Sequence, residues 1–135
     1  MLIRGEVHFL HIFVNCPFKV VETNAFEGLP ALTEIDLSKN RLTSLGNVFG
    51  NLTNLRKINL KENKKLTIVN KDFLALFKNI EQYGSGDNFQ IDINDISLDC
   101  GCDIRWLLEN RDMLQYFRSG ARCASGTLLK DVSML

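Results

Sequence analysis

Four cysteines are the residues of this chain best suited to covalent chemistry, and two of them lie one residue apart. Cys100 and Cys102 stand in the segment SLDCGCDIRWLL, Cys123 follows 21 positions after Cys102, and Cys16 lies far upstream. Two cysteines so close in sequence cannot readily form a bridge of good geometry with each other. Each of them is therefore expected to need a partner elsewhere.

Zinc is the metal that such a cysteine pair could hold, but its ligand set is incomplete here. Structural zinc takes four ligands, usually with two to four residues between the members of each pair. Only Cys123 and the distant His8 and His11 could complete the set. Both histidines stand in an apolar, strand-like run, which favours a structural role. We therefore expect neither a metal nor a cofactor.

Residues that could support catalysis are sparse. The GSG segment at Gly84–Gly86 lacks the flanking strand, helix and lysine of a phosphate-binding loop. The acidic residues Asp92 and Asp95 are interpreted as solvated loop charges. Two histidines and these few groups do not form a recognisable catalytic set, so the chain is not expected to be an enzyme.

The composition indicates one globular domain. The chain has 135 residues, of which 45% are hydrophobic and 24% are charged. Its 16 basic residues balance 16 acidic ones, which argues against a nucleic-acid binder held by phosphate contacts. No apolar run approaches the roughly 18 residues of a membrane span. The N-terminal segment lacks the basic start and clean apolar core of a signal peptide, so Met1 is not expected to begin a secreted precursor.

An internal repeat with a period of 23 or 24 residues organises the middle of the chain. The segments LPALTEIDLSKNRLTSL (29–45) and LTNLRKINLKENKKLTIV (52–69) share their apolar and asparagine positions, with one extra residue near the end of the second. The matching columns are Leu32/Leu55, Ile35/Ile58, Leu37/Leu60, Asn40/Asn63, Leu42/Leu66, Phe26/Phe49/Phe73 and Leu29/Leu52/Leu76. Because one repeat cannot bury its own apolar face, neighbouring repeats must stack.

This pattern resembles the leucine-rich repeat, L-x-x-L-x-L-x-x-N-x-L, in the class of about 24 residues that extracellular proteins use. The alternation predicts short strands centred on Glu34–Leu37 and Lys57–Leu60, with Ile35 and Leu37 pointing inward. Asn40 and Asn63 are expected to satisfy backbone groups of the turns from inside the coils. The resemblance implies an α/β fold, a solenoid whose parallel strands line a concave face.

The repeat is degenerate at both edges. Cys16 falls in the asparagine column and is expected to be a buried free thiol, although a disulfide to a partner outside this sequence is the alternative. The strand before it is either LHI or HIF, so the register of residues 1–17 stays open. Ile80, Tyr83 and Asn88 suggest a third, weak repeat in which Ser85 replaces an inward leucine, so this last coil is expected to be irregular or bulged.

The segment after the repeats resembles the cysteine-rich C-terminal cap of extracellular leucine-rich repeat proteins, which gives two parts, repeats at 1–96 and a cap at 97–135. Asp103 is a good N-cap for a helix through about Asn110, and Asp112 could cap a second short turn. The apolar face of the first helix would consist of Ile104, Leu107 and Leu108, with Trp106 close by.

In that family the first cysteine of the cap pairs with the third, and the second pairs with a fourth. The resemblance therefore implies a disulfide between Cys100 and Cys123 in an oxidising compartment. Cys102 has no fourth cysteine in this sequence, so the cap is expected to be truncated and the natural protein to continue beyond Leu135.

Two functions compete. The first is an extracellular scaffold that binds a protein ligand through its concave face, at Glu34, Asp36, Ser38, Lys57, Asn59 and Lys61, with Gln82 and Gly84 continuing the columns weakly. Simple solvation of these strand positions is the alternative reading. The second function comes from a resemblance to arthropod proteins related to the non-catalytic subunit of oplophorus-type luciferase, which implies an accessory subunit of a secreted oxygenase. No nucleic-acid partner and no membrane span are expected in either case.

A glycosylation motif favours the secretory pathway. Asn51-Leu52-Thr53 is an N-glycosylation sequon on the polar part of a coil. Together with the cysteine-rich segment, it predicts a secreted or cell-surface glycoprotein.

Overall fold

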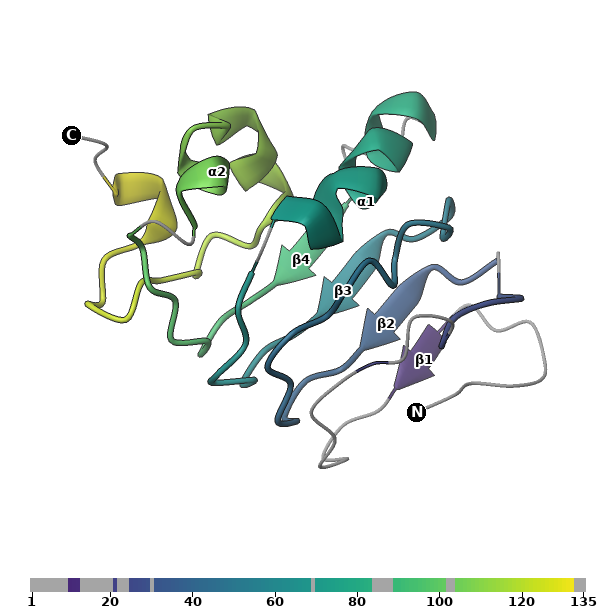
Figure 1. The fold of residues 1–135 in the computed structure, drawn as a ribbon, viewed down its shortest axis with the longest axis horizontal. Helices are drawn as coiled ribbons and strands as arrows, with labels where there is room; N and C mark the ends of the chain where they lie inside the picture. The colour runs from purple at the N-terminus through teal and green to yellow at the C-terminus, as the bar shows by residue number, and fades with distance from the viewer. Residues whose placement is uncertain are drawn as a thin grey trace.

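A sheet of four short parallel strands forms the centre of the computed structural model, which describes residues 10–12, 21, 25–29, 31–68, 70–83, 89–101 and 104–132. The strands lie in chain order and are β1 (Leu10–Ile12), β2 (Glu34–Asp36), β3 (Lys57–Asn59) and β4 (Gln90–Asp92). Figure 1 shows them side by side, with β1 at one end of the row and β4 at the other. The chain therefore advances one strand at a time, and the predicted parallel pairing is confirmed.

The register of the strands follows the repeat. Ile35 pairs with Ile58, as the sequence columns predict, and His11 pairs with Ile35. The strand before Cys16 is thus LHI, one of the two segments left open by the sequence. His8 and Cys16 lie outside the described residues.

The predicted apolar columns form one continuous core. Ile35 is 1% exposed, and Leu37 and Leu60 are fully buried. On the side away from the strands, the Phe26 and Phe49 rings stack with centroids 6.1 Å apart, and the Phe49 and Phe73 rings follow at 6.4 Å. These side chains belong to a single cluster that also includes buried residues of the C-terminal segment. Stacking of successive coils therefore buries what one coil could not.

Asn63 links two coils from inside the core. Its Nδ2 donates to the carbonyl oxygens of Leu37, at 3.0 Å, and Leu60, at 2.8 Å. Its Oδ1 accepts a hydrogen bond from the backbone N–H of Leu42, at 3.1 Å. The predicted role of the asparagine column is thereby confirmed. In the next coil the register places Ile96 at the equivalent position, so the asparagine column ends there.

The third coil differs from the prediction because it contains a helix, α1 (Asn70–Tyr83). Ile58 pairs with Ile91, 33 positions later, where the repeat predicts about 24. The expected third strand near Gln82 is therefore wrong, since Gln82 lies in α1. Gly84, Ser85 and Asn88 lie outside the described residues. Four buried side chains, spaced three and four residues apart, explain why a helix forms: Phe73, Leu76, Phe77 and Ile80.

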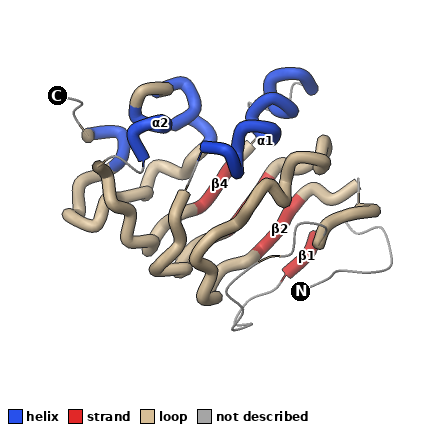
Figure 2. The backbone as a smooth tube through the Cα atoms, viewed as in Figure 1, coloured by secondary structure: helices blue, strands red, loops and turns tan. Residues whose placement is uncertain are grey.

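Three short helices follow β4, namely α2 (Arg105–Leu108), η3 (Arg111–Tyr116) and η4 (Leu129–Asp131). Figure 2 shows the helical segments in blue on one side of the row of strands. The predicted apolar face of the first helix is buried at Ile104, Leu107 and Leu108.

The two helix N-caps predicted for this segment were Asp103 and Asp112. The first helix ends at Leu108 rather than Asn110, and Ile104 precedes it without a side-chain cap. Asp103 lies outside the described residues. Asp112 does not cap the second turn, because the residue before η3 is Asn110 and Asp112 falls inside that helix. Within the described residues, no helix is long and apolar enough to cross a membrane.

Candidate protein-binding face and disulfide

The outward side chains of β2, β3 and β4 form one polar surface. Successive side chains of a strand point to opposite faces, and Ile35, Ile58 and Ile91 point into the core. Their neighbours therefore point outward, and the strand register aligns them in columns. We define the outer strand face by six of these residues: Glu34, Asp36, Lys57, Asn59, Gln90 and Asp92.

The structure brings together most of the residues that were predicted for binding. Glu34 lies beside Lys57, and Asp36 lies beside Asn59. Lys57 is exposed, whereas Glu34, Asp36, Asn59 and the following Lys61 are half-buried. Opposite charges thus occupy neighbouring strands on one surface.

Ser38 departs from this expectation, because it is only 5% exposed. Its hydroxyl donates to Oδ1 of Asp36 at 2.6 Å, and its backbone N–H donates to the same oxygen at 3.0 Å. The hydroxyl is therefore used inside the turn, and Ser38 is not an open contact position.

The same turn recurs at the ends of β3 and β4. Oδ1 of Asn59 accepts from the N–H of Lys61 at 3.1 Å, and Oδ1 of Asp92 accepts from the N–H of Asn94 at 3.0 Å. A short polar side chain can satisfy a backbone donor two residues on in this way. The column of Asp36, Asn59 and Asp92 thus has a structural role in closing the strands.

The strand that carries Gln90 and Asp92 was not predicted from the sequence. Asp92 is not a solvated loop charge: it is 7% exposed and lies 3.5 Å from the guanidinium of Arg118. The backbone N–H of Arg118 also donates to the carbonyl of Ile91, at 2.9 Å. The alternation QIDI, with both isoleucines buried, was the signal that could have identified this strand. Asp95, by contrast, is exposed as expected.

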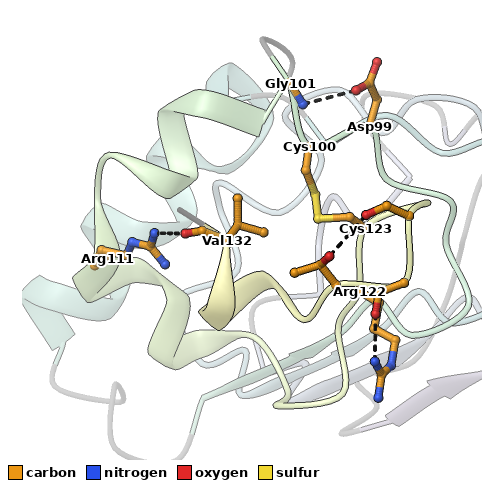
Figure 3. Close-up of a disulfide and its surroundings, with 10 residues drawn as sticks. Asp99, Cys100, Gly101, Arg111, Arg122, Cys123 and Val132 are labelled. Atoms are coloured by element: carbon orange, nitrogen blue, oxygen red, sulfur yellow. Dashed lines mark hydrogen bonds between the residues drawn. A yellow bond between two sulfur atoms is a disulfide. The ribbon is translucent and has the colours of Figure 1, made fainter. Parts of the chain in front are cut away.

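The disulfide between Cys100 and Cys123 is present (Figure 3). The Cα atoms of the two residues are 5.6 Å apart, and 23 positions separate them in sequence. Next to the bridge, the N–H of Ala124 donates to the carbonyl of Leu98 at 2.7 Å. The bridge and this bond fix the segment around Cys123 against the chain that leaves the last coil. Cys102 lies outside the described residues.

The predicted glycosylation sequon can also be placed. Asn51 is exposed and Thr53 is half-buried, while Leu52 between them is buried, so the sequon lies at the surface. Among the described residues, no group of three or more His, Cys, Asp or Glu side chains is arranged to hold a metal ion.

Comparisons with known proteins agree on the fold. Residues 12–64 match the leucine rich repeat family profile. No curated protein matches the sequence. Among solved structures, the crystal structure of human 5T4 (Wnt-activated inhibitory factor 1, trophoblast glycoprotein) is similar, with a TM-score of 0.68 and 22% sequence identity. The match covers 86% of this chain and 42% of that one. At this identity the similarity shows the fold alone, and that fold is the leucine-rich repeat fold.

Proposed function

We propose that this chain is a non-enzymatic module that binds a protein ligand through the outer strand face. The observation that carries the proposal is the alignment of Glu34 and Lys57, opposite charges on adjacent parallel strands, with side chains that the fold does not bury completely. Complementary charges across an interface mainly set its specificity and association rate. A rigid sheet that displays such a pattern suits recognition of a folded or extended protein segment.

The proposed architecture is a solenoid with the outer strand face on its concave side. Residues 1–96 would form the repeats, and residues 97–135 would close the open core as a cysteine-rich cap. Support comes from Leu98, Leu107 and Phe117, which are buried in the same cluster as the repeat leucines. The Trp106 ring also stacks with Phe73, at a centroid distance of 6.4 Å. An uncovered end of a repeat core would expose apolar surface, which a cap prevents.

The proposed location is extracellular, either secreted or at the cell surface. Disulfides persist in oxidising compartments, and the Cys100–Cys123 bridge fits such a place. The exposed sequon at Asn51 is accessible to glycosylation. The name of the similar human protein includes the word glycoprotein, which is consistent with this location.

The test combines partner capture with a charge-exchanged variant. The full oxidised chain is immobilised, captured proteins are identified, and each candidate is purified for a direct affinity measurement. The variant Glu34→Lys/Lys57→Glu exchanges the charges on the outer strand face without changing the net charge. We expect it to lose at least about tenfold in affinity, because like charges would then face each other across the interface.

A matched control uses α1, where Lys78 and Glu81 are both exposed. The variant Lys78→Glu/Glu81→Lys makes the same exchange away from the strands and should change the affinity less than twofold. Equal losses in both variants, or none in either, would contradict binding through the outer strand face.

The alternative, a non-catalytic accessory subunit of a secreted luciferase-like oxygenase, remains a hypothesis that rests on sequence resemblance. It differs from the first proposal in the identity of the partner. A captured partner that is a small oxygenase would favour it, and a receptor-like or matrix partner would favour the general scaffold.

A further inference from the structure

A polar cavity lies where the ends of the third and fourth strands meet the disulfide-bonded segment. Its volume is about 550 Å³. One wall comes from the turns that follow β3 and β4, including Lys61, Lys64 and Asn94. The other wall comes from the segment around Cys123, including Arg122. The cavity therefore exists only because the last coil and the C-terminal segment are held together.

Basic groups dominate the charged lining of this cavity. Lys61, Lys64 and Arg122 line it together with one acidic residue, Asp95. Among the described residues, neither Lys61 nor Lys64 has an ion-pair partner. Nη1 of Arg122 donates to the carbonyl of Gly126 at 2.8 Å, which orients the guanidinium. Figure 3 shows that Arg122 directs this group away from the disulfide. Such a set of cations favours a negatively charged group in the cavity.

The cavity is continuous with the outer strand face through Lys61, which follows Lys57 and Asn59 at alternate positions of the same coil. A segment that lies across the outer strand face therefore reaches the cavity at its end nearest the disulfide. The neighbouring coil carries Glu34 and Asp36, which repel an extended polyanion such as a sulfated glycan. A single carboxylate within a mixed-charge protein segment avoids that repulsion.

We propose that the cavity bounded by Lys61, Lys64 and Arg122 is a subsite for an aspartate or glutamate side chain of the protein partner. This inference rests on the proposed function and specifies the chemistry of the partner at one end of the surface. In this arrangement the acidic side chain enters beside the disulfide, while a basic part of the same segment meets Glu34 and Asp36. The subsite thus also sets the direction in which the partner lies.

A model peptide tests the subsite before the partner itself is identified. A blocked peptide that carries one glutamate near one end and two lysines near the other is titrated into the full oxidised chain, and backbone amide shifts are followed by NMR. We expect saturable shifts at Ser97, Gly120 and Arg122, which line the cavity. Lys61→Gln and Arg122→Gln should each weaken binding about two- to fivefold, as expected for solvent-accessible ion pairs. Lys78→Gln on α1 is the matched control and should leave the affinity unchanged.

Two outcomes overturn the proposal in this experiment. The first is the absence of shifts at the cavity, or shifts that both cavity variants leave unaltered. The second is equal or tighter binding at the same amides by inorganic sulfate, or by a heparin-derived oligosaccharide at matched ionic strength, because the site would then not select a protein carboxylate.

A captured partner separates this inference from the proposed function. If the charge-exchanged variant of Glu34 and Lys57 loses affinity while Lys61→Gln/Arg122→Gln keeps it, the subsite is wrong and the binding face stands. If both variants keep full affinity for the partner, the proposed function itself is wrong. Loss in both, with the α1 control unchanged, supports the two together.

Discussion

Asn63 shows how much a single side chain contributes where two coils meet. It is fully buried and satisfies three backbone groups, at Leu37, Leu42 and Leu60. Replacement by alanine leaves two carbonyl groups and one N–H without this partner in the core. Each buried polar group that loses its partner costs about 1 to 3 kcal/mol. We therefore expect Asn63→Ala to lower the free energy of unfolding by about 2 to 4 kcal/mol, measured by urea denaturation.

Asn47, which is exposed, provides the control for this prediction. Asn47→Ala removes the same atoms from the surface and should change the stability by less than about 0.5 kcal/mol. A loss below about 1 kcal/mol for Asn63→Ala would mean that the asparagine column is not needed to join the coils.

At the scale of single residues, the sequence predicted the buried role of an asparagine better than it predicted which polar side chains reach solvent. The hydrogen-bonding role of Asn63 was predicted because its position after the strand fixes which backbone groups its side chain can reach. Ser38 was predicted to face outward, but its hydroxyl is held by Asp36 inside a turn. Whether a polar side chain at a strand end faces solvent or closes its own turn depends on turn geometry, which the repeat pattern does not specify.

The inward leucines of the strands supply the next test, at the scale of the element. Leu37 and Leu60 are fully buried at the same position of adjacent coils. Truncation of such a side chain removes its contacts and leaves a cavity, which costs about 2 to 5 kcal/mol. We expect Leu37→Ala to lower the free energy of unfolding by that amount in chemical denaturation.

Leu74 on α1 is the matched control, because it is the same residue type and is 42% exposed. Leu74→Ala should cost less than about 1 kcal/mol, since little buried contact is lost. Similar losses for Leu37→Ala and Leu74→Ala would show that the inward column does not carry the stability of the coils.

The third coil shows where prediction from the repeat failed. Phe73 and Leu76 fitted the repeat columns and are buried, so their burial was predicted correctly. Phe77 and Ile80 extend the same apolar face with helical spacing, and the resulting helix lengthens the coil. A residue can fit both the columns of the repeat and the spacing of a helix. The match of Phe73 and Leu76 to the repeat columns therefore did not reveal the helix. Because the helix lengthens this coil, the next strand, at Gln90–Asp92, comes later in the sequence than the repeat predicts.

For the whole molecule, aromatic contacts join the repeats to the C-terminal segment. The Phe77 ring lies 5.5 Å from the ring of Tyr116 and 6.4 Å from that of Trp106. Nε1 of Trp106 also donates to the carbonyl of Ile68, at 3.3 Å. The helix α1 thus has a role that the regular repeat lacks, because it supplies the aromatic surface on which the C-terminal segment packs.

The location of the protein gives a prediction at this scale. Asn51 is exposed within its sequon, so passage through the secretory pathway should leave an N-linked glycan there. We expect mass spectrometry of the natural protein to find the Asn51 peptide modified, and Asn51→Gln in a secreting host to remove one glycan. A natural protein whose Asn51 peptide is always unmodified would remove this support for an extracellular location.

The disulfide carries the last prediction, because it closes the segment that shapes the proposed subsite. In chain-entropy terms, a bridge across 23 positions restricts the unfolded chain and contributes about 2 to 4 kcal/mol. We expect Cys100→Ser to lower the free energy of unfolding by that amount under oxidising conditions. Cys102→Ser removes a neighbouring thiol without breaking the Cys100–Cys123 bridge, and it should have the smaller effect.

Non-reducing peptide mapping of the oxidised chain should recover Cys100 and Cys123 in one linked pair of peptides. Reduction should then act on stability and on the subsite together. The amides of Gly120 and Arg122 lie on the side of the cavity that the bridge holds in place, so their response to the mixed-charge peptide should weaken in Cys100→Ser but persist in Cys102→Ser. A Cys102–Cys123 linkage in the map would show that the pairing is wrong. An unchanged peptide response in Cys100→Ser would show that the bridge does not build the cavity.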